Sequence, residues 1–190
     1  MFAETINDKK IGVLSDTHGS CCAWRKALAL FGPGVKTVLH AGDVLYHGPR
    51  NAIPGGYTPA DLADDINIFH KHGGRVIIAQ GNCDAAVDAM VLEPEIHSCV
   101  SLLWNGRRIL MMHGDNFPLL RAMALRSNVD LAISGHTHVC SVFREERTIC
   151  LNPGSTTIPK GRDPESAAVI DYDGIRIMTL EGDELRFEKW

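Results

Sequence analysis

The stretch 10-KIGVLSDTHGS-20 decides the fold, because a short apolar run passes directly into polar sequence that contains a glycine. Residues 10–15 are largely apolar and partly β-branched, which predicts a buried strand. A helix is expected from about Ser20, and Gly32-Pro33 supplies its stop. Its apolar face has the spacing i, i+3, i+4, i+7 and consists of Trp24, Ala27, Leu28 and Phe31.

The alternation of strand and helix continues through the first half of the chain. A second strand is expected over 35–40, a helix from the capping residue Thr58 to Gly73, and a third strand over 75–80. The connection 44–58 is long and rich in glycine and proline, and loops of that length often cover a functional site. The β-α-β-α-β order predicts an α/β fold with a largely parallel sheet.

The second half of the chain favours antiparallel strands. Asn105-Gly106 is a strong hairpin signal between apolar runs at 100–104 and 107–112. A helix is expected over 118–126. Further strands are expected near 131–134, 139–143, 149–151, 167–171, 175–180 and 184–188. We therefore expect two sheets packed face to face, the second rich in antiparallel strands, with helices outside.

Composition predicts one soluble domain over residues 1–190. The chain is 45% hydrophobic and 22% charged, and it has no apolar run long enough to span a bilayer. The N-terminal MFAETINDKK lacks the apolar region of a signal peptide, so the cytoplasm is the expected compartment. The six cysteines are scattered without a C-x-x-C pair, which argues against a structural zinc site. The net charge of −4 argues against stable nucleic-acid binding.

Side chains that can bind a metal follow the predicted strands one after another. They are Asp16, His18, Asp43, Asn82, His113, His136 and His138. In extended chain, residues i and i+2 project to one side, so Asp-x-His and His-x-His can each direct two ligands into one cavity. Each motif alone has an ordinary explanation as a helix cap, a solvated strand end or a turn. Because the motifs recur at successive strand ends, a shared metal site is favoured over a chance occurrence of unrelated motifs.

Five ordered stretches resemble the sequence blocks of the calcineurin-like metallophosphoesterase superfamily. They are SDTHG at 15–19, AGD at 41–43, GNCD at 81–84, MHG at 112–114 and GHTH at 135–138. The chain also resembles the small bacterial YfcE-type phosphodiesterases of that superfamily. This resemblance is carried by GDVLYHGPRN at 42–51, GNCD at 81–84, NPGS at 152–155 and IPK at 158–160. It implies an α/β fold that is a four-layer α/β/β/α sandwich of two mixed β-sheets flanked by helices.

The resemblance also implies two divalent metal ions, most simply Mn, although Fe, Zn, Co and Ni suit the same nitrogen and oxygen ligands. One ion would be held by Asp16, His18, Asp43 and His138, and the other by Asp43, Asn82, His113 and His136. Asp43 would bridge the ions, and Asp43, Asn82 and His113 are the expected catalytic residues. A hydroxide bridging the metals would attack phosphorus in line.

Two positions depart from the superfamily pattern. Many members have a histidine in place of Cys83, where it helps to protonate the leaving group, and a thiol is a poor acid for an alkoxide. A preference for substrates with good leaving groups, diesters among them, is therefore expected, or else another acid in the role of the histidine. Asp115 replaces a histidine and is expected to be an exposed helix-start acid, with a contact to a metal ligand as the alternative. Cys83 and Arg50 are the candidate substrate contacts, although Arg50 is equally suited to an exposed loop. His40 is expected to be buried and hydrogen-bonded.

These features predict a metal-dependent phosphodiesterase for a small phosphodiester or nucleotide-like substrate. The alternatives are a phosphomonoesterase or pyrophosphohydrolase with the same metals, and a non-catalytic scaffold of the same fold. No membrane partner is expected. The chain is expected to form a homo-oligomer, either a dimer or a tetramer.

Overall fold

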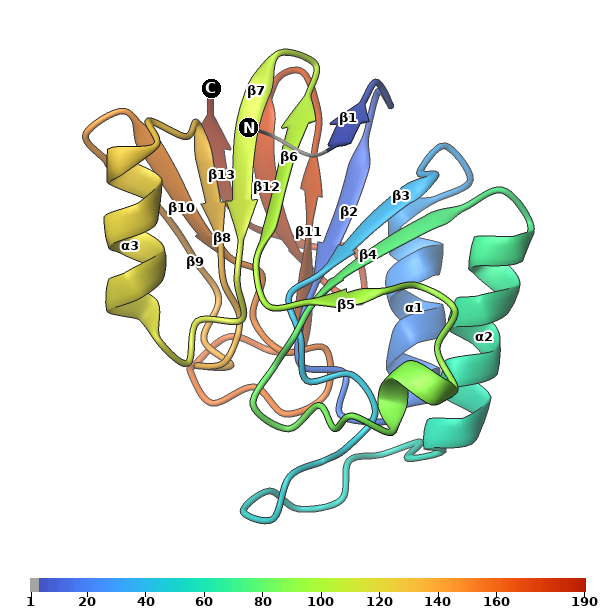
Figure 1. Ribbon diagram of the computed structural model, residues 1–190. Helices are drawn as coiled ribbons and strands as arrows, with labels where there is room; N and C mark the ends of the chain where they lie inside the picture. Colours follow the sequence, from blue (N-terminus) through green and yellow to red (C-terminus); the bar gives the residue numbers. More distant parts are fainter. Residues whose placement is uncertain (1–3) are drawn as a thin grey trace.

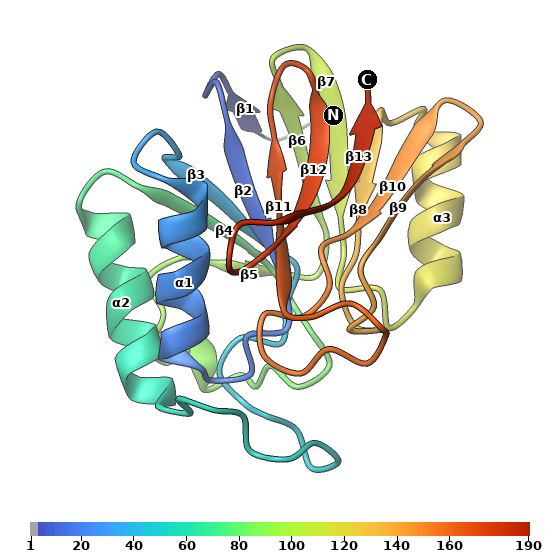
Figure 2. The ribbon, with the colours of Figure 1, turned by 180° about the vertical axis from the view of Figure 1, so that it is seen from behind.

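Two β-sheets pack face to face, with helices on both outer surfaces (Figures 1 and 2). The computed structural model describes residues 4–190. Residues 1–3, part of the N-terminal stretch judged not to be a signal peptide, lie outside the described residues. Helices α1 (Cys21–Phe31) and α2 (Pro59–Lys71) cover one sheet, and α3 (Phe117–Arg126) covers the other. The predicted four-layer α/β/β/α sandwich is confirmed.

Within residues 4–190, one sheet has seven strands. Their order is β13 (Glu184–Lys189), β12 (Gly174–Thr179), β11 (Ser166–Ile170), β2 (Ile11–Leu14), β3 (Thr37–His40), β4 (Arg75–Ala79) and β5 (Ile96–His97). The strands from β2 to β5 run parallel, and β11, β12 and β13 extend the sheet from β2 by antiparallel pairing. The parallel part is the predicted β-α-β-α-β unit.

The other sheet has six strands in the same described range. Their order is β1 (Glu4–Ile6), β6 (Val100–Trp104), β7 (Arg107–Met111), β8 (Leu131–Ile133), β10 (Thr148–Asn152) and β9 (Ser141–Glu145). The predicted hairpin is β6–β7, with Asn105 and Gly106 both at positive φ in its turn. Strands β7, β8 and β10 run parallel, because α3 carries the chain back across the sheet between β7 and β8.

The expectation of a separate, antiparallel-rich second sheet was therefore wrong in two respects. The last three strands join the first sheet through β11 and β2, and the second sheet contains parallel pairs. The strand expected at 139–143 spans Ser141–Glu145, because its pairing with β10 ends where Ser141 lies opposite Asn152. Three short elements were not predicted: β1, β5 and a 3-10 helix at Asp88–Met90.

The core lies in three parts that match the layers. The largest fills the space between the sheets around Leu39, Trp104 and Ile109, and the second joins α1 and α2 to their sheet through Trp24 and Ile66. A smaller cluster lies beneath α3. No helix in the described part of the chain is long and apolar enough to cross a membrane.

Candidate metal centre

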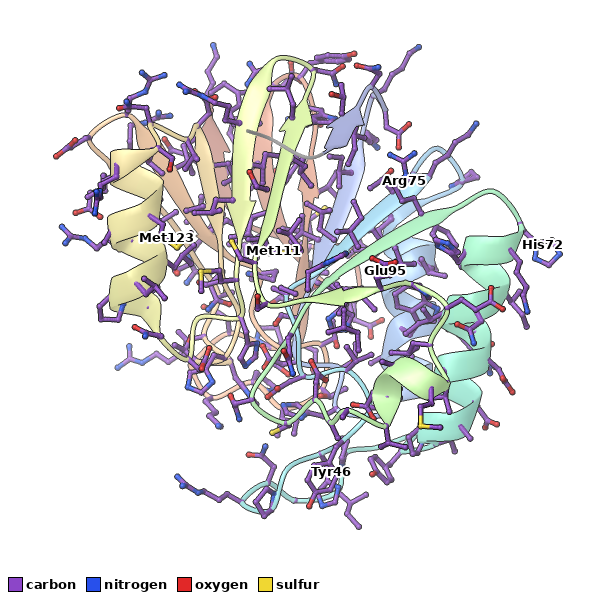
Figure 3. All side chains as sticks on the ribbon, viewed as in Figure 1. Tyr46, His72, Arg75, Glu95, Met111 and Met123 are labelled. Carbon is purple, nitrogen blue, oxygen red and sulfur yellow. The ribbon has the colours of Figure 1, made fainter. Side chains whose placement is uncertain are left out.

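Loops from both sheets converge at the carboxyl ends of β2, β3, β4, β7 and β8, and they carry all seven predicted ligands. Asp16 and His18 follow β2, Asp43 follows β3, Asn82 follows β4, His113 follows β7, and His136 and His138 follow β8. Most of these side chains are buried, but His136 is half-buried and Asn82 is exposed. The long loop after β3 hangs below this edge, where Figure 3 labels Tyr46. Ligands of α/β proteins commonly gather at such strand ends.

The first group of ligand atoms consists of Asp16 Oδ1, His18 Nε2 and His138 Nε2. Asp16 Oδ1 lies 3.7 Å from His18 Nε2 and 3.3 Å from His138 Nε2, and the two imidazole nitrogens are 3.2 Å apart. Ligands at about 2.0–2.2 Å from one metal are separated by about 3.0–3.6 Å, so the group has the right dimensions. Asp16 Oδ1 is buried and has no hydrogen-bond partner among residues 4–190, which leaves its lone pairs available.

The second group of ligand atoms consists of Asn82 Oδ1, His113 Nε2 and His136 Nδ1. Asn82 Oδ1 lies 2.7 Å from His136 Nδ1 and 3.1 Å from His113 Nε2, and the two nitrogens are 3.3 Å apart. The three atoms form a compact triangle with spacings that suit one metal ion. The donor set is imidazole nitrogen and amide oxygen, which is compatible with Mn, Fe, Co, Ni and Zn.

Asp43 joins the two groups. Its Oδ2 lies 3.8 Å from His18 Nε2 and 3.5 Å from His113 Nε2, one atom from each group. Its other oxygen, Oδ1, accepts a hydrogen bond from the Cys83 N–H at 2.8 Å. The N–H fixes the carboxylate so that Oδ2 faces both groups, which is the position of a bridging ligand.

Backbone carbonyls set the orientation of three imidazole rings. His18 Nδ1 bonds to the Tyr46 carbonyl at 2.8 Å, His113 Nδ1 to the Ala41 carbonyl at 2.7 Å, and His138 Nδ1 to the Ile158 carbonyl at 2.7 Å. A carbonyl only accepts, so Nδ1 must donate in each pair. In the neutral ring, Nε2 then presents its lone pair to the ligand groups, as a metal requires.

Five of the seven predicted ligands have a backbone conformation that side-chain-bearing residues rarely adopt. Positive φ values occur at Asp16 (55°), His18 (44°), Asp43 (58°), His136 (66°) and His138 (58°). This left-handed region is uncommon outside glycine and is enriched at functional sites. The pairs Asp16/His18 and His136/His138 therefore reach the site from left-handed turns, and not from extended chain as was expected from the sequence.

Close packing of the loops depends on glycine at two positions. A Cβ added at Gly81 would lie 2.1 Å from Asp43 Oδ1, and one added at Gly42 would lie 2.7 Å from the Gly81 nitrogen. Both contacts are far below van der Waals distance. The 42–43 and 81–82 loops therefore approach closely enough to bring Asp43 and Asn82 into the same site.

Asp84 has a structural role that the sequence did not reveal. Its carboxylate accepts hydrogen bonds from the backbone N–H groups of Gly81 at 2.7 Å, Asp43 at 3.0 Å and Val44 at 2.7 Å. It thereby holds together the loops that carry Asp43 and Asn82. The sequence signal for this role was the position of Asp84 at the end of the GNCD block. Acidic residues after turns are common, so the position alone does not indicate that the side chain binds neighbouring backbone.

Residues at and after the end of β10 fix the loops that carry Asp16 and His136. The hydroxyls of Ser155 and Thr157 both donate to the Asp16 carbonyl at 2.9 Å. The Asn152 amide donates to the Gly135 carbonyl at 2.7 Å, next to His136. Asn152 and Ser155 belong to the NPGS stretch at 152–155, whereas Thr157 was not singled out from the sequence, and the structure shows the contacts of all three to ligand-bearing loops.

The electrostatics of the site couple Asp43 with His113. Burial raises the pKa of Asp43, but the hydrogen bond and charge of His113 and the Cys83 N–H outweigh it and hold the pKa below its ordinary value. Burial lowers the pKa of His113, and the neighbouring carboxylates outweigh this effect and raise it to about 9. Burial lowers the pKa of His18 and of His136, so both are poised as neutral ligands.

Cys83 and Arg50, the two candidate substrate contacts, line one cleft of about 640 Å³ beside Asp43 and Asn82. The cleft also contains Lys160, a cationic residue that the sequence did not single out for a role. Burial, followed by the charge of Asp43, raises the pKa of Cys83 to about 12, so the thiol keeps its proton at neutral pH.

The two remaining expectations concern Asp115 and His40. Asp115 is exposed and directly precedes Asn116, whose Oδ1 caps α3 by accepting from the Leu119 N–H at 3.2 Å. This is the position of a helix-start acid. His40 is buried, and its Nδ1 accepts from the Gly42 N–H at 3.1 Å, as expected for a hydrogen-bonded core histidine. Burial lowers the pKa of His40 to about 3, so the ring is neutral.

Comparison with known proteins identifies the family. The family model of the calcineurin-like phosphoesterase superfamily domain matches residues 10–174. The chain belongs to this superfamily. It is 38% identical over 174 residues to phosphodiesterase YfcE of Escherichia coli strain K12, covering 90% of this chain and 92% of that protein. It is 30% identical over 174 residues to a probable metallophosphoesterase of Methanothermobacter thermautotrophicus, covering 88% of each chain.

Solved structures agree with the sequence comparison. The structure of the phosphoesterase YfcE from E. coli matches with a TM-score of 0.82 and 33% identity, covering 95% of this chain and 98% of that one. Vacuolar protein sorting 29 from Cryptosporidium parvum matches with a TM-score of 0.68 at 18% identity, covering 96% and 97%. The second likeness is one of fold alone.

Proposed function

We propose that this chain is a metal-dependent phosphodiesterase that hydrolyses a small phosphodiester or nucleotide-like substrate at a dinuclear centre. The observation that carries the proposal is the position of Asp43 Oδ2, 3.8 Å from one ligand group and 3.5 Å from the other. Membership of the calcineurin-like superfamily and 38% identity to a named phosphodiesterase support the reaction class.

We assign one ion to Asp16, His18, Asp43 and His138, and the other to Asp43, Asn82, His113 and His136. Nitrogen and oxygen ligands without thiolate suit Mn, Fe, Co, Ni and Zn alike, and among these we propose Mn because of the family to which the chain belongs. When bound, the two ions would supply Lewis acidity, lowering the pKa of water and neutralising phosphate oxygens. The orphaned Asp16 Oδ1 and the carbonyl-oriented histidines support the fit of these residues to metal ions.

Protein side chains in the cleft are placed to orient the substrate. Arg50 and Lys160 bring positive charge to the same cleft as Asp43 and Asn82, where they can bind non-bridging phosphate oxygens. The protonated Cys83 thiol is a weak acid for an alkoxide leaving group. Diesters with good leaving groups need no such acid, which favours them over esters whose leaving group is an alkoxide.

The test is Mn-stimulated hydrolysis of bis-p-nitrophenyl phosphate by the purified protein. Asp43→Ala and Asn82→Ala should abolish turnover, because the first removes the carboxylate between the two groups and the second removes a ligand atom of the second group. His97→Ala, which changes an exposed histidine outside the site, is the control and should keep full activity. Turnover of p-nitrophenyl phosphate separates diester from monoester preference. Unchanged activity in both ligand variants, or a protein that binds no metal in elemental analysis, would contradict the proposal.

We also propose a cytoplasmic location and a homo-oligomer, a dimer or a tetramer. The cysteines Cys21, Cys22, Cys83, Cys99, Cys140 and Cys150 are free thiols, which suits a reducing compartment. Strand β9 is an edge strand, and exposed Phe143 on it lies near exposed Phe117 at one hollow. An open edge beside apolar side chains favours contact between copies. Light scattering during gel filtration measures the assembly.

A further inference from the structure

An apolar hollow of about 560 Å³ adjoins the catalytic cleft. Three segments form it: the loop after β3, the first turns of α2, and the chain around the 3-10 helix at Asp88–Met90. The lining residues include Leu45, Tyr57, Pro59, Ala60, Val87 and Val91. Tyr46 and Ala85 line both the hollow and the cleft, so the two cavities adjoin at these residues.

The surface of this hollow is unusually apolar for an exposed position. Val87 is 59% exposed, Val91 50% and Tyr46 41%. Exposed apolar side chains that gather in a concave surface mark a ligand or partner site. The charged residues that line it within the described chain are Asp64 and Asp88, both acidic. A second phosphate would be repelled there, whereas an uncharged group would not.

The walls of the hollow are fixed relative to the ligand groups. The Tyr46 carbonyl bonds to His18 Nδ1 at 2.8 Å, which ties this wall to a proposed ligand. The Tyr57 ring packs so closely on Gly19 that an added Cβ would lie 2.5 Å from it. The His47 ring lies between the two tyrosines, with centroid distances of 4.7 Å to Tyr46 and 5.2 Å to Tyr57. The hollow is therefore preformed.

We propose that this hollow binds an uncharged aromatic arm of the phosphodiester, an inference that rests on the proposed activity. The phosphate would occupy the cleft, and the aromatic ester group would extend past Tyr46 into the hollow. Flat rings pack favourably on tyrosine edges and aliphatic side chains. The substrate class is thus a diester with an aryl or nucleobase-bearing arm, and the two acids disfavour a polyphosphate chain in the hollow.

The test compares two ligands that differ only in the aromatic arm. The Mn-loaded protein is titrated by calorimetry with 4-nitrobenzylphosphonate and with methylphosphonate, neither of which is hydrolysed. We expect at least tenfold tighter binding of the aromatic ligand. Ala60→Trp fills the hollow from an exposed helix position and should remove this preference while leaving methylphosphonate affinity within about twofold. Ala122→Trp on the exposed face of α3 is the matched control and should change neither affinity.

A second measurement is independent of metal and of turnover. In saturation-transfer NMR, 4-nitrobenzyl alcohol should bind the metal-free protein and lose its signal with Ala60→Trp. Equal affinity for the two phosphonates, or an alcohol signal unchanged by Ala60→Trp, would overturn the proposal. So would a change of assembly state in Ala60→Trp with the aromatic preference retained, since that assigns the hollow to contact between copies. Aromatic preference without diester hydrolysis would refute the activity alone.

Discussion

Replacing His136 by alanine and by glycine tests whether the ligand loops store backbone strain. His136 has φ 66° and is half-buried, so both substitutions remove the same imidazole and leave little cavity. A left-handed residue with a Cβ costs about 1–2 kcal/mol relative to glycine. Glycine loses about 0.5–1 kcal/mol through the greater freedom of its unfolded chain. The glycine variant should therefore be the more stable by about 0.5–1 kcal/mol.

The assay is urea and thermal unfolding of the metal-free protein, followed by circular dichroism. For a chain of this length the difference corresponds to a Tm about 1–4 °C higher for His136→Gly than for His136→Ala. Ala122→Gly, at an exposed helical position of α3, is the control and should have the opposite sign, with a loss of about 0.5–1 kcal/mol. A glycine variant no more stable than the alanine variant would refute the strain argument.

Two further predictions concern His113 and Asp84. Because the pKa of His113 is about 9, Mn binding below pH 9 should release a proton from this ring. Mn affinity should therefore rise with pH up to about 9. Calorimetry in buffers of different ionisation enthalpy measures both the affinity and the proton release. Protonated His113 also stabilises the folded metal-free protein below pH 6.5, and this contribution to the free energy of unfolding should be lost as the pH rises to about 9. A Mn affinity that stays constant over this pH range would contradict both statements. Asp84→Ala leaves three backbone N–H groups without their acceptor and should cost at least about 3 kcal/mol in urea unfolding. Asp115→Ala, an exposed acid, should stay within about 0.5 kcal/mol of wild type, and equal losses would show that charge rather than bonding is responsible.

The sequence predicted the layers and the family well, because both depend on local patterns. The first strand, its helix and the hairpin at Asn105-Gly106 follow from apolar periodicity and turn chemistry. The pairing of β11 with β2 could not be predicted in this way. It joins residues more than 150 positions apart, and the choice between two sheet edges depends on packing that no local pattern encodes. The short strands β1 and β5 were not predicted for a related reason, because their stability comes from pairing with neighbouring strands.

The same distinction between local and long-range information decides which residues of the candidate site could be predicted from the sequence. Residues whose chemistry is unusual for their place, such as paired histidines after a strand, were found from the sequence. Asp84, Ser155 and Thr157 were not, since each acts by bonding to the backbone of another loop. A hydroxyl or carboxylate that bonds to a peptide group looks the same in sequence as one that faces water.

These supporting contacts have a consequence for how the site assembles. Ser155 and Thr157 fix the Asp16 carbonyl, Asp84 fixes the Asp43 N–H, and carbonyls orient three imidazoles, all without metal. The positive-φ ligands are thus held by protein contacts, and the cost of their conformation is met in folding. Metal binding then needs little rearrangement of the backbone. The chief remaining cost is electrostatic, and it lies in removing a proton from His113, whose pKa the neighbouring carboxylates raise.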